Sequence, residues 1–503
     1  MKPVRQTRRD FLKSAGIGAV SLTFSGFSSD SQSGSIPYKK ELYNEPYRPQ
    51  FHLTPEYGWM NDPCGMFYYN GEYHFHYQGN PHNPKGWGSQ WSHAVSNDLV
   101  HWKNLAPSLV QDEKYGGCST GSCIVDWKNT SGFQTGKENV IVLIFTITDP
   151  DQKQGVAFSN DRGRSWERFA GNPVIVSTDG NKDFRDPKVF WHEPLKKWVM
   201  VVSRGYTAPG DIFQSEDLKK WEHTGKAPNG ECPDMFELSV PDSNNKKWLY
   251  LCGDYPMAPN GTGAKYFIGN FDGKNFQAES AQSRLGGNFF VGQSFGDIPS
   301  SDDRRIWMGW KWLSDEGDFG PWTGGFQSIP VELSLMETGN HILQLNYKPI
   351  KELHALRKEH FKINNMVIGT NCSLLEEQKL RGELIECSAV FQLDSAKEFG
   401  FLIRKGLNTE SVLRYHVLDK RITFTDAAGK EKFSQLLAPQ NGIIKLHLLI
   451  DRSVIDVFGN DGMTWNCGFF KADPPDQGIE LFAKEGNVKL TSFDCWQLKS
   501  IFD

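Results

Sequence analysis

One short pattern recurs four times in the first three hundred residues, at a spacing of roughly 55 to 65 residues. Each copy reads as a strand, a tight polar turn and an aromatic residue that starts the next strand. The copies are AVSNDLVHW ending at Trp102, AFSNDRGRSW ending at Trp166, FQSEDLKKW ending at Trp221 and IGNFDGKNF ending at Phe276. A period of this length with about four strands per unit is typical of a β-propeller.

A second series of strand-like segments lies out of phase with the first. Its members begin at Asn61, Ser119, Arg185, Glu231 and Gly292. If these are the innermost strands of successive blades, the propeller has five blades, and the N-terminal ends of the strands converge at one face of the central axis. Asp62, Asp186 and Glu231 stand at three of those ends. The sequence therefore predicts that three acids far apart in the chain share one funnel.

The pattern changes near residue 345, which divides the predicted fold into an all-β propeller and a second all-β domain. We expect the propeller over 45–345 and a connector over 346–360, in which IKELHALRKEHF is consistent with a short helix. From 361 to 503 alternating segments such as LIECSAVFQLD and IIKLHLLIDRSVIDVFGNDG return. Many short strands joined by turns indicate a C-terminal β-sandwich.

The first 36 residues are predicted to be an export signal and linker rather than part of the fold. Arg8 and Arg9 precede Phe11-Leu12-Lys13, and a short apolar run follows over 15–24. This order resembles a twin-arginine signal, which places the mature protein in the periplasm or outside the cell. The apolar run is too short for a permanent membrane span, so we expect no stable membrane insertion.

Composition excludes some classes of function. The net charge is −5, and no long basic run follows the N-terminus, so nucleic acid is not an expected partner. The nine cysteines are scattered without metal-type spacing, and no phosphate loop or dinucleotide fingerprint is present, so we predict neither metal nor cofactor. The aromatic content of 13%, with 16 tryptophans, fits a β-rich protein and also a carbohydrate binder.

Three converging acids suit the cleavage of a glycosidic bond. Retaining glycosidases place two carboxyl groups about 5–5.5 Å apart, one as nucleophile and one as proton donor. A third acid can hold sugar hydroxyls, and Arg185 would keep the neighbouring Asp186 charged. Each acid alone is equally consistent with a turn residue, because Asp before Pro commonly initiates turns. The three together, at matching blade positions, favour catalysis.

The motifs WMNDPCG, RDPKV and ECPDMFEL resemble the three signatures of glycoside hydrolase family 32, which holds invertases, inulinases and levanases. The resemblance extends over nearly all of residues 50 to 500. It implies a five-bladed propeller followed by a β-sandwich, and cleavage of β-fructofuranosides with retention. It also implies that Asp62 is the nucleophile, Glu231 the acid/base and Asp186 the transition-state stabiliser.

The same resemblance suggests substrate-binding residues. They are Asn61, Gln78, Trp87, Thr120 and Arg185. The chain departs from the family pattern at Cys64, at Ser119-Thr120 and in FGPWTGGFQSIPVEL, which lacks an Arg. These departures leave the preferred fructoside open. Trp310 and Trp312 fit either a wall of the pocket or the core of a blade, and we favour packing.

We therefore hypothesise an exported retaining hydrolase that releases fructose, by exo attack, from levan, inulin, fructo-oligosaccharides or sucrose. One alternative is an arabinanase-like propeller glycosidase that also uses three acids but inverts the anomeric centre. The other is a non-catalytic carbohydrate-binding protein. The stereochemistry of the product separates the first alternative, and binding without any release of reducing sugar would support the second.

Overall fold

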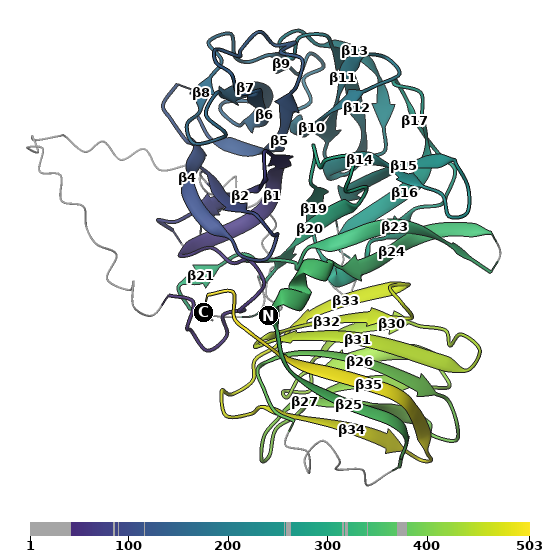
Figure 1. Cartoon of the computed structure of the whole chain (residues 1–503). Coiled ribbons are helices and arrows are strands. Elements are labelled where there is room, and N and C mark those ends of the chain that lie inside the picture. The colour runs from purple at the N-terminus through teal and green to yellow at the C-terminus, as the bar shows by residue number, and fades with distance from the viewer. Residues whose placement is uncertain are drawn as a thin grey trace, which may run out of the picture. The chain divides into compact units, whose positions relative to one another are not determined.

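The regular structure of the chain is almost entirely β-strand (Figure 1). The computed structural model describes residues 42–83, 86–88, 90–114, 116–255, 257, 263–313, 316, 320–339, 341–369 and 380–502. Residues 43–503 form one compact unit. The predicted export signal and linker, 1–36, lies outside the described residues.

Residues 58–349 form five sheets, in each of which the long strands are antiparallel to their neighbours. The first contains β1 (Gly58–Tyr69), β2 (Glu72–Asn80), β3 (Gln90–Ser96), β4 (Lys103–Val110) and the short β21 (Trp322–Thr323). The second contains β5 (Cys118–Asp126), β6 (Val140–Ile147), β7 (Lys153–Ser159), β8 (Glu167–Arg168) and β9 (Ile175–Val176). The third contains β10 (Arg185–His192), β11 (Lys197–Arg204), β12 (Ala208–Ser215) and β13 (Glu222–Ala227). The fourth contains β14 (Glu231–Ser239), β15 (Lys246–Gly253), β16 (Ala264–Phe271), β17 (Phe276–Ala278) and β18 (Ser283–Arg284). After the 3-10 helix η1 (Gly286–Asn288), the fifth contains β19 (Val291–Ser294), β20 (Arg305–Trp312), β22 (Gly325–Gln327), β23 (Val331–Thr338) and β24 (Ile342–Pro349).

The first strands of the five sheets form a closed ring. Each contacts the next, in the order β1, β5, β10, β14 and β19, and β19 contacts β1 again. Figure 1 shows these five strands at the centre of the propeller. Strand pairing also joins the two ends of the propeller segment, because β21, near its C-terminal end, pairs in parallel with the start of β1.

The repeated polar segments are turns that lead into the last strand of a sheet. In each of the four the carboxylate of an aspartate accepts backbone N–H groups two to four residues further on; the residues are Asp98, Asp161, Asp217 and Asp272. Such local bonds are the reason that Asp favours turns. Trp102, Trp166 and Trp221 then directly precede β4, β8 and β13. The repeat therefore arises from turn chemistry that is used once in each of the first four sheets.

The second domain begins after the 3-10 helix η2 (Lys351–Leu356) and contains two sheets. One sheet has the order β25 (Arg357–Ile368), β35 (Val488–Leu498), β26 (Leu384–Gln392), β31 (Ile443–Asp451), β32 (Val454–Gly459) and β33 (Thr464–Phe469). The other has the order β30 (Glu431–Leu436), β29 (Arg421–Thr425), β28 (Ser411–His416), β27 (Glu398–Lys405) and β34 (Gly478–Lys484). Buried side chains of both sheets pack into one hydrophobic cluster, which makes the domain a β-sandwich. The strand β25 begins inside the segment expected as a connector, and the predicted domain bounds stay a prediction.

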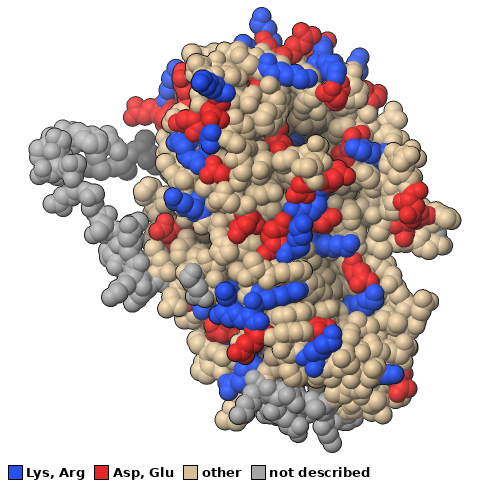
Figure 2. Space-filling model, in the orientation of Figure 1, with Lys and Arg blue, Asp and Glu red and all other residues tan. Residues whose placement is uncertain are grey.

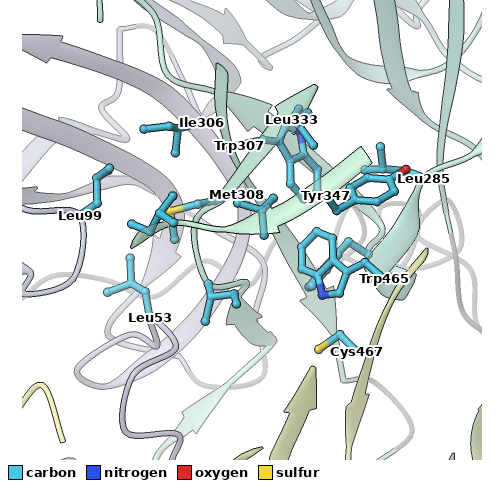
Figure 3. Packing of buried hydrophobic residues seen from close by; sticks show 14 of the residues in the cluster. Leu53, Leu99, Leu285, Ile306, Trp307, Met308, Leu333, Tyr347, Trp465 and Cys467 are labelled. Atoms are coloured by element: carbon cyan, nitrogen blue, oxygen red, sulfur yellow. The ribbon is translucent and has the colours of Figure 1, made fainter. Parts of the chain in front are cut away.

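The propeller and the sandwich share a hydrophobic core. Figure 3 shows Trp465 and Cys467 of the sandwich beside Tyr347 and Leu285 of the propeller. The rings of Tyr347 and Trp465 lie 5.9 Å apart between centroids. Burial of large aromatic side chains contributes most of the favourable energy of such contacts.

A buried charged cluster joins the same two domains. His52, at the start of the propeller segment, lies with Nδ1 2.8 Å from Asp451 Oδ2 and Nε2 2.8 Å from Asp456 Oδ2. Burial alone would lower the pKa of His52, but hydrogen bonds to Asp451 and Asp456 outweigh it and raise the pKa to about 9. His52 is therefore a buried cation held between two carboxylates of the sandwich.

Charged side chains of both signs are mixed over the face shown in Figure 2, without a large area of one sign. Among the described residues, no helix combines the length and the apolar character needed to cross a membrane.

Candidate active site

The first strands of four sheets share an irregularity near their N-terminal ends. The pairing register shifts between Met60 and Pro63 in β1 and between Ser119 and Gly121 in β5. It also shifts between Arg185 and Lys188 in β10 and between Glu231 and Asp234 in β14. Such bulges bend a strand and redirect its side chains, often beside active sites.

Proline explains why the bulges form at these motifs. Pro187 and Pro233 lie within the shifts of β10 and β14, and Pro63 stands at the end of the shift in β1. A proline has no N–H to donate to a ladder, so regular pairing is interrupted there. Asp186 (φ 61°) and Cys232 (φ 45°) also have left-handed backbone conformations, which are costly for residues other than glycine and concentrate at functional sites.

Asp62 is fully buried and lies at the end of a chain of polar side chains. Asn61 Nδ2 donates to Gln78 Oε1 at 2.9 Å, and Gln78 Nε2 donates to Thr120 Oγ1. Thr120 Oγ1 in turn donates to Asp62 Oδ2 at 2.8 Å. The structure therefore brings Asn61, Gln78 and Thr120 together with Asp62. The second oxygen, Oδ1, is buried and receives no hydrogen bond from the described residues.

Cys232 connects two of the acids and is the chain neighbour of the third. Its backbone N–H donates to Asp186 Oδ2 at 3.1 Å, and its thiol lies 3.6 Å from Asp62 Oδ2. Thr146 Oγ1 accepts the backbone N–H of Asp186 at 2.8 Å, which supports the strained turn. Cys232 thus contacts both Asp62 and Asp186, while the Nε of Arg185 lies 3.6 Å from Asp186 and 3.0 Å from Glu231 and links the third carboxylate to the same group.

Glu231 is buried and accepts hydrogen bonds from two side chains. Arg185 donates through Nε at 3.0 Å and through a terminal nitrogen to Oε1, while the Tyr206 hydroxyl donates to Oε2. The Arg185 Nε lies 3.6 Å from Asp186 Oδ2, so the guanidinium that we expected to serve Asp186 is closer to Glu231. Burial disfavours the charge on Arg185, but Glu231, Asp186 and Asp183 outweigh it and hold its pKa well above the usual range.

Aromatic residues lie next to this cluster. Trp87 is half-buried, with ring centroids 5.2 Å from Trp59 and 5.7 Å from Trp312. Trp59 Nε1 also donates to Asn61 Oδ1 at 2.9 Å, which links the aromatic group to the polar chain. Trp310 is fully buried and packs against Phe290, in agreement with the preference for packing.

Cys64, which departs from the family pattern, lies in a hydrophobic cluster with Trp91 and Cys123. Burial, followed by the charge of Asp62, raises the pKa of its thiol well above the usual range. Among the described residues, no group of three or more His, Cys, Asp or Glu side chains has the geometry of a metal site.

Two protein-family models together match almost the whole described chain. Residues 52–346 match the N-terminal domain of the glycosyl hydrolases family 32, and residues 352–497 match the C-terminal domain of that family. The chain belongs to glycosyl hydrolase family 32. The propeller and sandwich, and the class of glycoside hydrolase, are thereby confirmed.

Family 32 relatives cover most of the chain. It is 40% identical to a levanase of Bacillus subtilis (strain 168), over 95% of this chain and 73% of that protein. It is 31% identical to an invertase of Debaryomyces hansenii, over 88% of this chain and 92% of that protein. The solved exo-inulinase of Aspergillus awamori superposes with a TM-score of 0.82 at 26% identity, over 91% of this chain and 99% of that one.

Sequence reasoning missed two residues of the cluster. Tyr206 lies in the turn after β11, where no motif marks it, and it reaches Glu231 only because the fourth sheet follows the third around the ring. Cys232 lies inside the ECPDMFEL motif. Its position directly after Glu231 and before Pro233 was the signal in the sequence that could have identified it as a site residue.

Proposed function

We propose that this family 32 hydrolase cleaves β-fructofuranosides by a retaining mechanism, with Asp62 as nucleophile, Glu231 as acid/base and Asp186 as stabiliser. The observation that carries the proposal is that Cys232 contacts both Asp62 and Asp186, and that Arg185 lies beside both Asp186 and Glu231. Acids in contact with a common residue lie close enough to act on a single bound sugar. The relatives named levanase, invertase and exo-inulinase support fructose as the released sugar.

In the first step, a carboxylate oxygen of Asp62 attacks the anomeric carbon, and the bond from that carbon to the leaving oxygen breaks. Glu231 gives its proton to the leaving oxygen, which departs as an alcohol. In the second step Glu231 takes a proton from water, and the resulting oxygen nucleophile displaces Asp62 from the anomeric carbon. Two inversions give net retention, and the enzyme returns to its starting protonation.

The neighbouring residues have supporting roles in this scheme. Thr120 holds one oxygen of Asp62 and leaves Oδ1 for the substrate. Arg185 and Tyr206 fix the Glu231 carboxyl in place, as a proton donor and acceptor has to be oriented. Asn61 and Gln78 offer amide groups to sugar hydroxyls, and Trp87 offers an aromatic wall.

Products and stereochemistry test the proposal. We expect fructose as the first product from levan, inulin or sucrose, because an exo-acting enzyme removes terminal units. Proton NMR of the earliest product should show the anomer with the configuration of the substrate. Initial release of the opposite anomer would favour the inverting, arabinanase-like alternative. Binding of the polymers without any reducing sugar would favour the non-catalytic one.

We also propose that residues 1–36 direct twin-arginine export to the periplasm or the exterior. Arg8 and Arg9 carry this proposal, and the extracellular exo-inulinase of Aspergillus ficuum, 30% identical, supports an exterior location. Replacing Arg8 and Arg9 together by Lys should retain the protein in the cytoplasm, whereas Arg5→Lys should not. Equal export of both variants would contradict the proposal.

A further inference from the structure

A cavity lies at the ends of the first strands that are remote from the acids. It has a volume of about 540 Å³ and is lined by residues of the second, third, fourth and fifth sheets, including Val125, Trp191 and Ser239. Trp191 follows Asp186 by five positions along β10. At about 3.3 Å per residue, the two residues are separated by roughly 16 Å along the strand. The cavity therefore opens at the other end of the ring from the candidate active site, and its size is that of a small-ligand pocket.

The rim of this cavity carries an unusual tryptophan. The structure describes all 16 tryptophans, and Trp127 is the only one that is exposed, with 53% of its surface accessible. Its Nε1 donates to Asp297 Oδ1 at 2.8 Å, so the indole is held in place although it is open to solvent. A second indole, Trp191, is half-buried in the lining, and Lys128 Nζ lies 4.5 Å from the centre of its ring. Two fixed aromatic rings thus face a polar cavity.

The charges of the lining balance. Five basic residues contribute to it, namely Lys128, Lys188, Lys246, Arg304 and Arg305, and five acidic ones, namely Glu193, Glu237, Asp297, Asp302 and Asp303. This composition disfavours an anionic or cationic ligand, because either would meet as many like charges as opposite ones. It suits a neutral ligand with many hydroxyl groups, which can donate to carboxylates and accept from amines.

Individual groups in the lining retain hydrogen-bonding capacity. Arg305 Nη1 donates to Phe295 O at 3.2 Å, but its buried Nε donates to none of the described residues. Asp297 accepts from Trp127 and from the backbone N–H of Val125. Burial raises the pKa of Asp297 to about 6, so above that pH it presents a carboxylate to the cavity.

We propose that this cavity is a second carbohydrate-binding site, which holds a stretch of a neutral fructan chain other than the end being cut. The apolar C–H face of a sugar ring would pack on Trp127, and its hydroxyl groups would bond to the surrounding charged side chains. The choice of fructan as the ligand rests on the proposed function. Anchoring at this site raises the local concentration of polymer ends without changing the hydrolysis of a short substrate.

Trp127→Ala tests the proposal by comparing a polymer with a short substrate. We expect kcat/KM on levan or inulin to fall roughly threefold to tenfold, the effect of one aromatic contact, with kcat/KM on sucrose unchanged. Trp127→Phe, which keeps an aromatic face, should retain most of the polymer activity. Phe502→Ala removes an exposed aromatic residue far along the chain and should change neither value. Equal loss on polymer and sucrose, or no loss on either, would overturn the proposal.

Binding without turnover separates this proposal from the proposed function. The Asp62→Asn protein should be retarded in gels that contain levan or inulin, with sucrose present in excess to occupy the first site. Adding Trp127→Ala should remove most of that retardation. If the parent protein hydrolyses no fructoside, the proposed function fails while this comparison still reports on the cavity. Retardation that is independent of Trp127, or a dimer that Trp127→Ala dissociates, would assign the cavity to another role.

Discussion

Two buried carboxylates, Asp451 at the joint between the domains and Asp62 in the predicted funnel of the propeller, have opposite surroundings. Both are fully buried. Asp451 accepts the backbone N–H groups of Gln50, Phe51 and His52 at 2.5, 2.8 and 2.9 Å, and it also bonds to the His52 ring. Asp62 accepts from Thr120 and the Cys232 thiol, and its Oδ1 receives no hydrogen bond from the described residues.

The contrast distinguishes a structural acid, Asp451, from the proposed nucleophile, Asp62. A carboxylate whose two oxygens both accept hydrogen bonds from another segment holds the two segments together. A buried carboxylate with an unused oxygen costs stability, and such a cost persists where function requires it. The joint should therefore determine stability, and the funnel should determine activity.

The largest expected effect is on activity. Asp62→Asn should lower the rate of fructose release by at least about ten-thousandfold, because an amide cannot serve as the nucleophile. Its melting temperature should stay the same or rise slightly, since a poorly solvated charge is removed. Asp217→Asn, at a turn in the third sheet, is the matched control and should keep full activity. Normal turnover by Asp62→Asn would contradict the nucleophile assignment and would favour the interpretation of Asp62 as a turn residue.

Asp451→Asn should show the opposite behaviour. Breaking the buried pair on one side leaves the His52 cation with Asp456 alone, at a cost of about 3–5 kcal/mol in the free energy of unfolding. Urea titration measures this loss, and kcat of the folded fraction should not change. Asp494→Asn breaks partly exposed pairs with His360 and Lys362 in the same domain and should cost less than about 1 kcal/mol. A fall in kcat of the folded Asp451→Asn protein, without a loss in its free energy of unfolding, would contradict the assignment of Asp451 to stability.

The joint should also weaken at alkaline pH. The pKa of His52 is about 9 in the folded protein, above the value of 6.5 expected when it is unfolded. Its stabilising contribution is therefore complete below pH 6.5 and is lost as the pH rises through about 9, to a limit of about 3 kcal/mol. Unfolding free energies measured from pH 6 to 10 should show this fall, and His52→Gln should remove it. A His52→Gln protein with the same pH dependence as the parent would contradict this assignment.

The smallest expected effect concerns the funnel residue that the sequence did not indicate. Tyr206→Phe removes the hydroxyl that donates to Glu231, and we expect kcat on sucrose to fall roughly tenfold, as for one hydrogen bond to a charged group. Tyr255→Phe alters the ring that lies 5.7 Å from Tyr206 and should leave kcat unchanged. Equal kcat values for both variants would show that Tyr206 does not orient the Glu231 carboxyl.

The motifs show how far local sequence could predict the site. Asp62, Asp186 and Glu231 were placed at strand starts because turn and strand chemistry act over a few residues. The prolines that follow them explain the bulges at the same positions. The partner of Arg185 was not predictable in this way, because its distance to Glu231 depends on how two neighbouring sheets pack.

The sequence by itself determined the repeated strands and the change to a second all-β domain, and it singled out the three acids that we propose as catalytic. Each of these follows from alternation, turn residues and proline within short segments. Only the tertiary structure decided that Cys232 lies between two acids, that Tyr206 bonds to Glu231 and that His52 meets Asp451, 399 positions along the chain. Contacts of this kind depend on closing the ring of sheets and docking the sandwich, and no local rule specifies either.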